Sequence, residues 1–387
     1  MKITTDSIEW PKWPQFGIEE QDAVDRVIRS NQIFADREVK LFEEQFANYV
    51  GSEYAIGLGN ATQGLHLALA ALDVGVGDEV IVTPYSWISS ASCVLMQNAV
   101  PIFCDIEGDS LGLCPKDVEK KISQRTKAII PVHMFGYPAK IKEIMALSKH
   151  YGIPVIEDAS HAHGAELDNI KMGNFGKISV FSLHQRKALS VGDGGMVCTN
   201  DYNIYEKIRR LRSFGHEELS YNYRMTEFAG ALGQIGLKKL DYQNRIRENN
   251  ACYLSELLKG FNKVRVRLGR PGEHVVFFAV LIELLSNIPN IDTILKQLQK
   301  SGIPIRETWS PLHKHAHFNP TKPPARGIPW MSQSYDGQMK NLKYSELILP
   351  VVNTYCPHRI LELYVHPPTG KKEIEFAAEK IIEIFSI

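Results

Sequence analysis

Apolar and polar residues alternate with two different periods between about residue 17 and residue 245. A helical period in residues 18–30, 39–50 and 63–72 predicts helices that bury one face. Short runs rich in β-branched residues stand between the helical segments, and several are apolar throughout, as expected for strands covered on both faces. The runs are "DEVIVTP", "VPIFCDI", "KAIIPVH", "IPVIEDA" and "ISVFSL". Strand–helix alternation at this spacing predicts an α/β domain with a mostly parallel sheet.

The pattern changes after a long helical segment at residues 233–260. Beyond it we expect a smaller α+β unit. Strands are expected within residues 274–284, and helices over residues 291–302 and 373–385. A proline-rich loop is expected over residues 319–330. The sequence therefore predicts two domains: a large one over residues 1–245, with an N-terminal arm over 1–16, and a small one over 246–387.

Composition narrows the class of protein. The 387 residues carry 44 Lys+Arg and 44 Asp+Glu, so no excess of charge points to nucleic acid or to an anionic membrane. No apolar run is long enough to span a bilayer, and the start "MKITTDSIEWPKWPQFG" lacks the apolar core of a signal peptide. The six cysteines are scattered, with no C-x-x-C pair. We therefore expect a reduced, cytoplasmic protein without a metal site.

One lysine stands in an unusual setting. Lys187 lies in "SVFSLHQRKALSVGDGGMVCTND", where a strand gives way to a nearly apolar run and then to Gly192-Asp193-Gly194-Gly195. A solvated surface lysine needs no such surroundings. A lysine that works as a neutral amine does, because desolvation lowers its pKa.

Other segments offer candidate groups, each with a plain structural alternative. Asp158, at the end of a buried strand, could be a cap for the next turn. Thr62 lies in a Gly/Asn/Thr turn that enters a strong helix, which suits either a phosphate seat or an ordinary N-cap. Trp87 could be a core residue or a plate for a flat ligand. His161 and His163 could share a face and bind zinc, but no third ligand accompanies them.

Taken together, these groups suit one cofactor. In a parallel sheet, ligands lie at the carboxyl ends of the strands, where Asp158 and Lys187 are both expected. Pyridoxal phosphate needs a lysine for its aldehyde, an anion for its ring nitrogen, a phosphate seat and a ring stacker. We therefore expect pyridoxal 5'-phosphate as the cofactor.

Five segments carry a family resemblance: "GNATQGLHLAL", "GVGDEVIVTPYSWISSAS", "IEDASHAHGA", "FSLHQRKALSVGDGG" and "YNYRMTEFAGALGQIGLKKL". In combination they resemble the DegT/DnrJ/EryC1/StrS family of sugar aminotransferases, which have the aspartate-aminotransferase fold (fold type I). The likeness extends along most of the chain. It implies a large domain with a mostly parallel mixed sheet flanked by helices, followed by a smaller C-terminal α+β domain.

The resemblance assigns roles to single residues. Lys187 would bind the cofactor's aldehyde covalently, and Asp158 would pair with its ring nitrogen. Ala61, Thr62 and Ser182 would hold the cofactor's phosphate. Trp87 would stack on the face of its ring, and His161 would lie near its ring hydroxyl. Asn222 would reach the phosphate of a neighbouring subunit, because family sites are built at a homodimer interface. Substrate-side positions would be His184, Arg186, Trp309 and His313.

The implied reaction moves an amino group from glutamate or glutamine to a keto sugar, expected to be nucleotide-activated, or to a keto cyclitol. The opening "WPKWPQFG" is similar to a branch with scyllo-inosose-type aminotransferases and aminohydroxybenzoate synthases. Such a synthase is one alternative. A sugar dehydratase is another, although the known ketosugar dehydratases replace the lysine with histidine. A non-catalytic regulator that retains the fold is a third. "GLGNAT" lacks the third glycine of a dinucleotide-binding turn, which argues against a dehydrogenase.

Overall fold

The computed structural model describes residues 7–34, 36–214, 219–285, 291–318, 329–330, 333–334, 342–356 and 359–386. Most of the proline-rich segment at 319–330, expected to be a loop, lies outside them. No helix in these ranges is long and apolar enough to cross a membrane.

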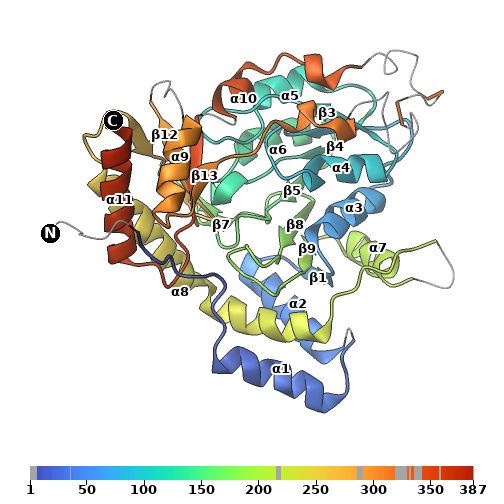
Figure 1. The fold of residues 1–387 in the computed structure, drawn as a ribbon. Helices are drawn as coiled ribbons and strands as arrows, with labels where there is room; N and C mark the ends of the chain where they lie inside the picture. The colour runs from blue at the N-terminus through green and yellow to red at the C-terminus, as the bar shows by residue number, and fades with distance from the viewer. Residues whose placement is uncertain are drawn as a thin grey trace.

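A mixed sheet forms the centre of the molecule (Figure 1). Its first part has the order β1 (Tyr54–Leu58), β9 (Gly195–Thr199), β8 (Ile178–Ser182), β5 (Ile156–Asp158), and its second the order β3 (Val100–Phe103), β2 (Glu79–Val82), β4 (Thr126–Ile130). Parallel bridges between Ile129 and Val155 and between Val132 and Asp158 join β4 to β5. Strand β9 runs antiparallel to both of its neighbours, β1 and β8, and the other pairs of strands in this sheet are parallel. The prediction of a mostly parallel mixed sheet is confirmed.

Helices flank this sheet. The flanking helices are α2 (Arg37–Val50), α3 (Ala61–Ala71), α4 (Ser89–Met96), α5 (Pro115–Lys121), α6 (Ile141–Tyr151) and α7 (Tyr202–Arg212). Helix α1 (Ile18–Ser30) lies away from the sheet and packs on α8 (Glu227–Leu257) (Figure 1). The hydrophobic period predicted three of the helices in this part of the chain, α1, α2 and α3. Helix α3 packs on β8 and β9 with an almost fully apolar surface. Its first turn is fixed by Asn60, whose side chain accepts a hydrogen bond from the Gln63 amide at 3.0 Å. The N-terminus of α3 therefore lies beside the carboxyl end of β8.

The C-terminal part contains a second, antiparallel sheet. Its order is β10 (Val264–Val266), β12 (Val280–Leu284), β14 (Ile360–Leu363), β13 (Ile305–Glu307), and the nearby helices are α9 (Ile291–Lys300), α10 (Pro350–Tyr355) and α11 (Lys371–Phe385). A small three-stranded sheet consists of β11 (Glu273–His274), β6 (Glu166–Leu167) and β7 (Ile170–Lys171).

Residues 274–284, expected to form strands, contain the end of β11 and the whole of β12, with a gap between the two strands. The chain leaves β11 after His274 and enters β12 only at Val280. In between, the amides of Val276 and Phe278 donate to the carbonyls of Gly136 and Phe135, at 3.4 and 3.0 Å. These hydrogen bonds take the backbone away from the small sheet and place Phe278 against the α/β part.

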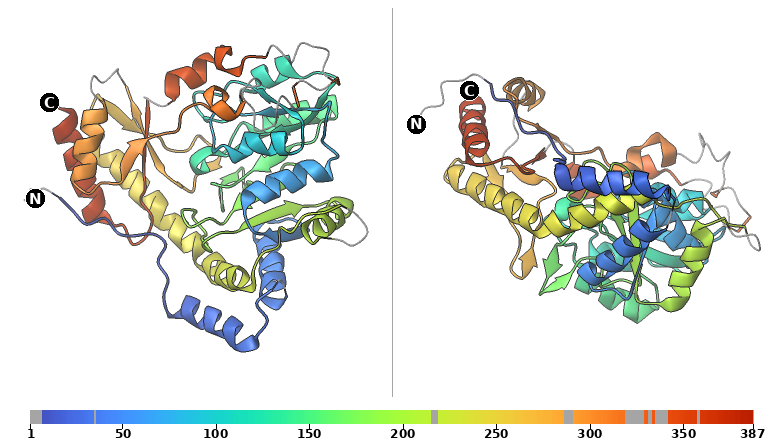
Figure 2. Two further views of the ribbon diagram at one scale, coloured as in Figure 1. Left: turned by 45° about the vertical axis from the view of Figure 1, so that its right-hand side comes forward. Right: turned by 90° about the horizontal axis from the view of Figure 1, so that it is seen from below.

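Helix α8 (Glu227–Leu257) belongs to both parts of the molecule (Figure 1). It packs on α1 and α2 at one end and on β10 and α11 at the other. The predicted domain boundary at residue 245 therefore falls inside a continuous helix, and the division into two domains stays a prediction. The N-terminal segment, expected as an arm of the large domain, passes along the C-terminal part before it reaches α1 (Figure 2).

Candidate active site

A cavity of about 530 Å³ opens at the carboxyl ends of β5 and β8. It is lined by ten of the residues singled out in the sequence, namely Ala61, Thr62, Trp87, Asp158, His161, Ser182, His184, Arg186, Lys187 and Trp309. These side chains come from the ends of five different strands or from the segments that follow them, namely β1, β2, β5, β8 and β13. The topology of the sheet thus brings together groups that are up to 248 positions apart, from Ala61 to Trp309.

Lys187 projects from the loop between β8 and β9. The loop is closed by amide–carbonyl bonds from Leu183 to Gly194 and from Gln185 to Gly192, each 2.8 Å long, and Gly192 has a φ of 95°. The lysine keeps some accessible surface because it lines the cavity, yet its amine is enclosed by the chain and lies 4.8 Å from the centre of the Phe278 ring. Burial lowers the pKa of the Lys187 amine to about 7, although the Asp158 carboxylate acts in the opposite direction.

Asp158 is the last residue of β5 and is buried. Its Oδ2 accepts a hydrogen bond from Ser90 Oγ at 2.6 Å, and its Oδ1 accepts one from the Ser160 amide at 3.1 Å. Ser90 Oγ also lies 2.7 Å from Ser86 Oγ. A chain of two hydroxyls therefore leads into the carboxylate and fixes its plane. Both serines also line the cavity.

Hydroxyls gather where α3 begins. Thr62 Oγ1 lies 2.7 Å from Ser89 Oγ, and Ser182 lines the same end of the cavity. A Cβ on Gly195 would collide with the backbone of Asn60, so this glycine allows β9 to lie directly against the turn before α3. Because the first amides of a helix lack intrahelical partners, hydroxyls and amides together make a seat for an anion.

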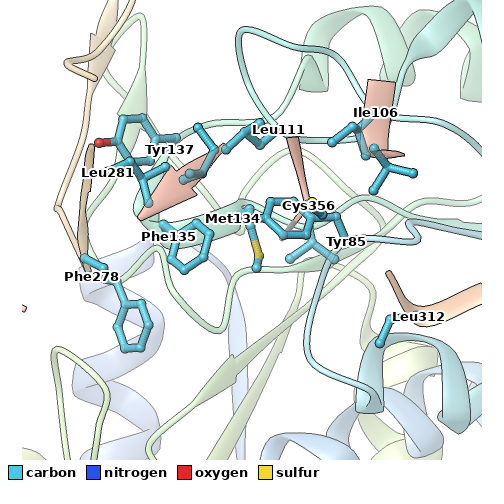
Figure 3. Close-up of a cluster of buried hydrophobic side chains, with 14 of the residues drawn as sticks. Tyr85, Ile106, Leu111, Met134, Phe135, Tyr137, Phe278, Leu281, Leu312 and Cys356 are labelled. Atoms are coloured by element: carbon cyan, nitrogen blue, oxygen red, sulfur yellow. The ribbon is translucent and has the colours of Figure 1, made fainter. Parts of the chain in front are cut away.

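His161 is held between aromatic rings. It stacks on Phe278 with a centroid distance of 4.2 Å and an angle of 6°, and it lies 5.9 Å from Phe135. Both phenylalanines belong to the buried cluster in Figure 3. Nδ1 accepts a hydrogen bond from the Phe135 amide at 3.2 Å, and burial keeps the pKa of His161 well below its usual value. His161 is therefore neutral, and its Nε2–H is left as a donor.

The zinc alternative finds no support in the positions of the two histidines. His163 packs 5.5 Å from the Phe181 ring in the core, whereas His161 lines the cavity. Within the described ranges, no three His, Cys, Asp or Glu side chains come together as a metal site.

The mouth of the cavity is less tightly held. Trp87 is 58% exposed and meets Trp309 edge to face at 5.8 Å. Trp309 in turn stacks on Phe135 at 5.7 Å. His184 and Arg186 are exposed at the rim. This side of the cavity offers aromatic faces and a cation to a ligand, with little fixed hydrogen bonding.

Two of the residues to which the family resemblance gives roles do not line this cavity. His313 is buried in apolar surroundings, 6.3 Å from the Phe103 ring, where burial lowers its pKa to about 4. His313 does not line the cavity, and its expected substrate-side role stays a prediction. Asn222 is exposed, and its Oδ1 accepts two hydrogen bonds from Arg224, at 2.9 and 3.2 Å. Its expected contact with a partner's phosphate stays a prediction.

Several residues that line the cavity were not predicted from the sequence. Ser86, Ser89 and Ser90 stand in the quoted stretch "YSWISSAS", whose hydroxyl content was the available signal. Phe278, Arg306 and Tyr364 come from the C-terminal part, and no motif marked them. Arg306 is fixed by an ion pair with the buried Glu362 and by a 2.7 Å hydrogen bond to the Tyr364 hydroxyl.

Comparison with known proteins assigns the family. Residues 14–345 match the model of the DegT/DnrJ/EryC1/StrS aminotransferase family. An L-glutamine:2-deoxy-scyllo-inosose aminotransferase from Streptomyces fradiae is 31% identical over 340 residues, which are 80% of either chain. A pleiotropic regulatory protein from Geobacillus stearothermophilus is 30% identical over 370 residues, 94% of this chain and 93% of that one.

A solved structure agrees with the family model. The aminotransferase from Psychrobacter cryohalolentis superimposes with a TM-score of 0.84 at 29% identity, covering 97% of this chain and 98% of its own. The chain therefore belongs to the DegT/DnrJ/EryC1/StrS aminotransferase family and is an aminotransferase with the fold type I architecture of pyridoxal-phosphate-dependent enzymes.

Proposed function

We propose that this aminotransferase uses pyridoxal 5'-phosphate to transfer the amino group of glutamine or glutamate to a keto cyclitol or a keto sugar. The observation that carries the proposal is the pairing, in one cavity, of a lysine whose pKa is lowered to about 7 with a buried, hydrogen-bonded aspartate. The cyclitol acceptor is supported by the Streptomyces fradiae relative, whose name states glutamine as donor and 2-deoxy-scyllo-inosose as acceptor.

The residues present fit this cofactor. When bound, pyridoxal phosphate supplies the electron sink for charge that develops on the substrate carbon. The hydroxyls of Thr62, Ser89 and Ser182 and the start of α3 would hold its phosphate. Asp158 would accept a hydrogen bond from the protonated ring nitrogen, and the Nε2–H of His161 would donate to the ring hydroxyl.

Lys187 would carry the proton transfers. An amine with a pKa of about 7 is largely neutral above that pH and can form a covalent bond to an aldehyde. Once released by the donor, the same Nζ can take a proton as a base and return it as an acid, because its pKa lies near neutral pH. Trp87 would cover one ring face, and the rim residues His184, Arg186 and Trp309 would contact the acceptor.

A homodimer and a cytoplasmic location complete the proposal. Asn222 would reach into the partner's cavity, with its Oδ1 held by Arg224 and its amide group donating to a phosphate. The scattered, unpaired cysteines favour a reducing compartment.

An absorption spectrum of the protein with added pyridoxal phosphate, before and after L-glutamine or L-glutamate, tests the function. We expect a visible band that an amino donor removes. The Lys187→Ala variant should stay folded by circular dichroism, give no such band and lose activity by about 10⁴-fold. A visible band that neither donor changes would favour a dehydratase or an aminohydroxybenzoate-type synthase.

A regulator is the second candidate, because the Geobacillus stearothermophilus protein matches 94% of this chain. A regulator that retained only the fold would not need a lysine with a lowered pKa beside Asp158. Absence of any visible band in the wild-type protein would favour the regulator over the enzyme.

A further inference from the structure

Two consecutive carbonyls of the lysine loop are held by side chains from distant segments. Trp13 Nε1 donates to the Lys187 carbonyl at 3.0 Å. Arg247 donates to the Ala188 carbonyl at 3.3 Å. Trp13 lies in the N-terminal arm and Arg247 in α8. The backbone of the reactive lysine is thus fixed directly at the residue and one position after it.

The two donors belong to one cluster, which we call the arm clamp: Trp13, Arg247 and His366. The Trp13 and His366 rings stack at 4.9 Å, and the Arg247 guanidinium lies 4.9 Å from the centre of the Trp13 ring. Arg247 Nε donates to His366 Nδ1 at 2.8 Å. The arm clamp therefore joins the arm, α8 and the segment after β14.

Arg247 is fully buried, and burial lowers its pKa to about 9. Its hydrogen bonds go to neutral acceptors, on His366, Asn244 and Ala188, and no ion pair with a carboxylate occurs in the ranges that the structure describes. A buried cation without an anion is unfavourable in free energy. An ion pair therefore does not explain why Arg247 is buried here. Its hydrogen bond to the Ala188 carbonyl, next to Lys187, does explain it.

The arm is docked before it reaches the clamp. The Ile8 amide donates to the Ser301 carbonyl at 3.0 Å, next to Gly302, which has a φ of 86° and where a Cβ would collide with the Ile8 carbonyl. Trp10 Nε1 donates to the Tyr364 carbonyl at 3.2 Å. Both contacts lie on the C-terminal part, so the arm is fastened there and then meets the lysine loop through Trp13 (Figure 2).

From this geometry we infer that Trp13 and Arg247 are positioning residues for Lys187. By fixing the carbonyls of Lys187 and Ala188, they keep the amine in place beside Phe278, at the wall of the cavity. A loosened loop would admit water to the amine and raise its pKa toward the usual value, leaving less neutral amine at pH 7. The chemical role of Lys187 rests on the proposed function, whereas its placement by the clamp does not.

Matched tryptophan variants test the inference in cofactor-free protein. Trp13→Phe keeps the stacked ring and removes the hydrogen bond to Lys187, and Trp10→Phe removes a similar bond from the same arm that ends on Tyr364. The readout is the pH dependence of Lys187 acetylation, followed by peptide mass spectrometry. In Trp13→Phe, we expect the pH of half-maximal acetylation to rise by about half a pH unit to one pH unit, as loss of one hydrogen bond predicts. In Trp10→Phe, we expect this pH to stay at the wild-type value.

Kinetics provide a second readout. Trp13→Phe should lower kcat by about tenfold with little change in KM for the donor, and Arg247→Lys, which keeps the charge, should lower kcat in the same direction. An unchanged acetylation profile in Trp13→Phe, or an equal shift in Trp10→Phe, would overturn the inference. The acetylation profile needs no cofactor, so a wild-type protein without a visible band would refute the proposed function and leave this test intact.

Discussion

Two adjacent carboxylates of β5 lie in different regions and are used differently. Side chains alternate across a strand, so Glu157 and Asp158 face opposite ways. Glu157 accepts hydrogen bonds from the amides of Gly173, Phe175 and Gly176, at 2.9, 2.7 and 2.6 Å, and its Oε2 lies 2.9 Å from His133 Nε2. Asp158 accepts only the bonds from Ser90 and Ser160 among the described residues, and it lines the cavity.

The difference separates a structural acid from a functional one. A carboxylate offers about four acceptor positions. The chain itself fills all four on Glu157, which holds the loop at residues 173–176 in place. On Asp158 two positions stay open toward the cavity. Both residues are buried, with 0% of Glu157 and 3% of Asp158 exposed, so unused hydrogen-bonding capacity is the property that marks the site.

The largest effects are expected from Asp158→Asn, on activity, and from Glu157→Gln, on stability. We expect Asp158→Asn to lose activity by about 10²- to 10³-fold with little loss of stability, because an amide cannot hold a proton on the ring nitrogen. Glu157→Gln should lower the free energy of unfolding by about 3 kcal/mol, because an amide group would face backbone donors.

Activity assays and urea unfolding of both variants provide the measurements. The folded fraction of Glu157→Gln should still give the visible band with pyridoxal phosphate. Equal losses of activity in the two folded variants would mean that the distinction between the carboxylates is wrong.

Ser86 and Ser90, whose hydroxyls lead to Asp158, test how far the support of this carboxylate matters for activity. Ser90→Ala removes a hydrogen bond to a charged group and should lower kcat by about tenfold. Ser86→Ala leaves the Ser90–Asp158 bond in place and should have a smaller effect. The pH at which the visible band changes should move in Ser90→Ala only. An effect of Ser86→Ala as large as that of Ser90→Ala would show that the two hydroxyls act as one unit.

The pH dependence of stability tests the environment of Lys187. Its pKa is lowered from the ordinary 10.5 to about 7 in the folded protein. Between these values the unfolded chain binds more protons, so the stability of the cofactor-free protein should rise with pH, and the burial penalty should be full only below pH 7. Lys187→Met should therefore stabilise the protein most at low pH, and its advantage should vanish above pH 10.5. Thermal unfolding across this range measures the difference, and a constant difference would contradict the lowered pKa.

The smallest effect is expected at the rim, where Arg186 is exposed. Arg186→Ala should raise KM for the acceptor by about two- to fivefold and leave the donor half-reaction unchanged, because a single exposed charge contributes little. Single-turnover kinetics with the donor, beside steady-state kinetics with the acceptor, separate the two. A changed donor half-reaction would move Arg186 from the rim to the reacting centre.

The sequence was sufficient for groups that lie at the ends of regular elements. Helical periodicity located α1 and α9. Asp158 ends a strand, Thr62 begins a helix and Lys187 lies in the loop between two strands, and the pattern of the sequence reveals each of these places. Long-range packing was not accessible. Phe278 enters the cavity because two hydrogen bonds to Phe135 and Gly136 hold the segment between β11 and β12.

Residues close together in one segment also lie in different environments. Trp309 lines the cavity and His313 is buried beside Phe103, although both belong to "TWSPLHKHAHF". Ser90 carries no motif of its own and is defined only by its distance to Asp158. The arm clamp was equally hidden, because its members are separated by more than 100 positions.

Helix α8 restricts how this protein can be divided. Its 31 residues extend over about 46 Å. Cleavage or a chain break at residue 245 would separate Asn244, which binds the His163 carbonyl, from Arg247, to which its side chain is hydrogen-bonded. Two fragments split at that point would each carry half of a helix and an incomplete support for the lysine. The large and small parts are therefore expected to act as one inseparable folding unit, and a tolerated split must lie outside residues 227–257.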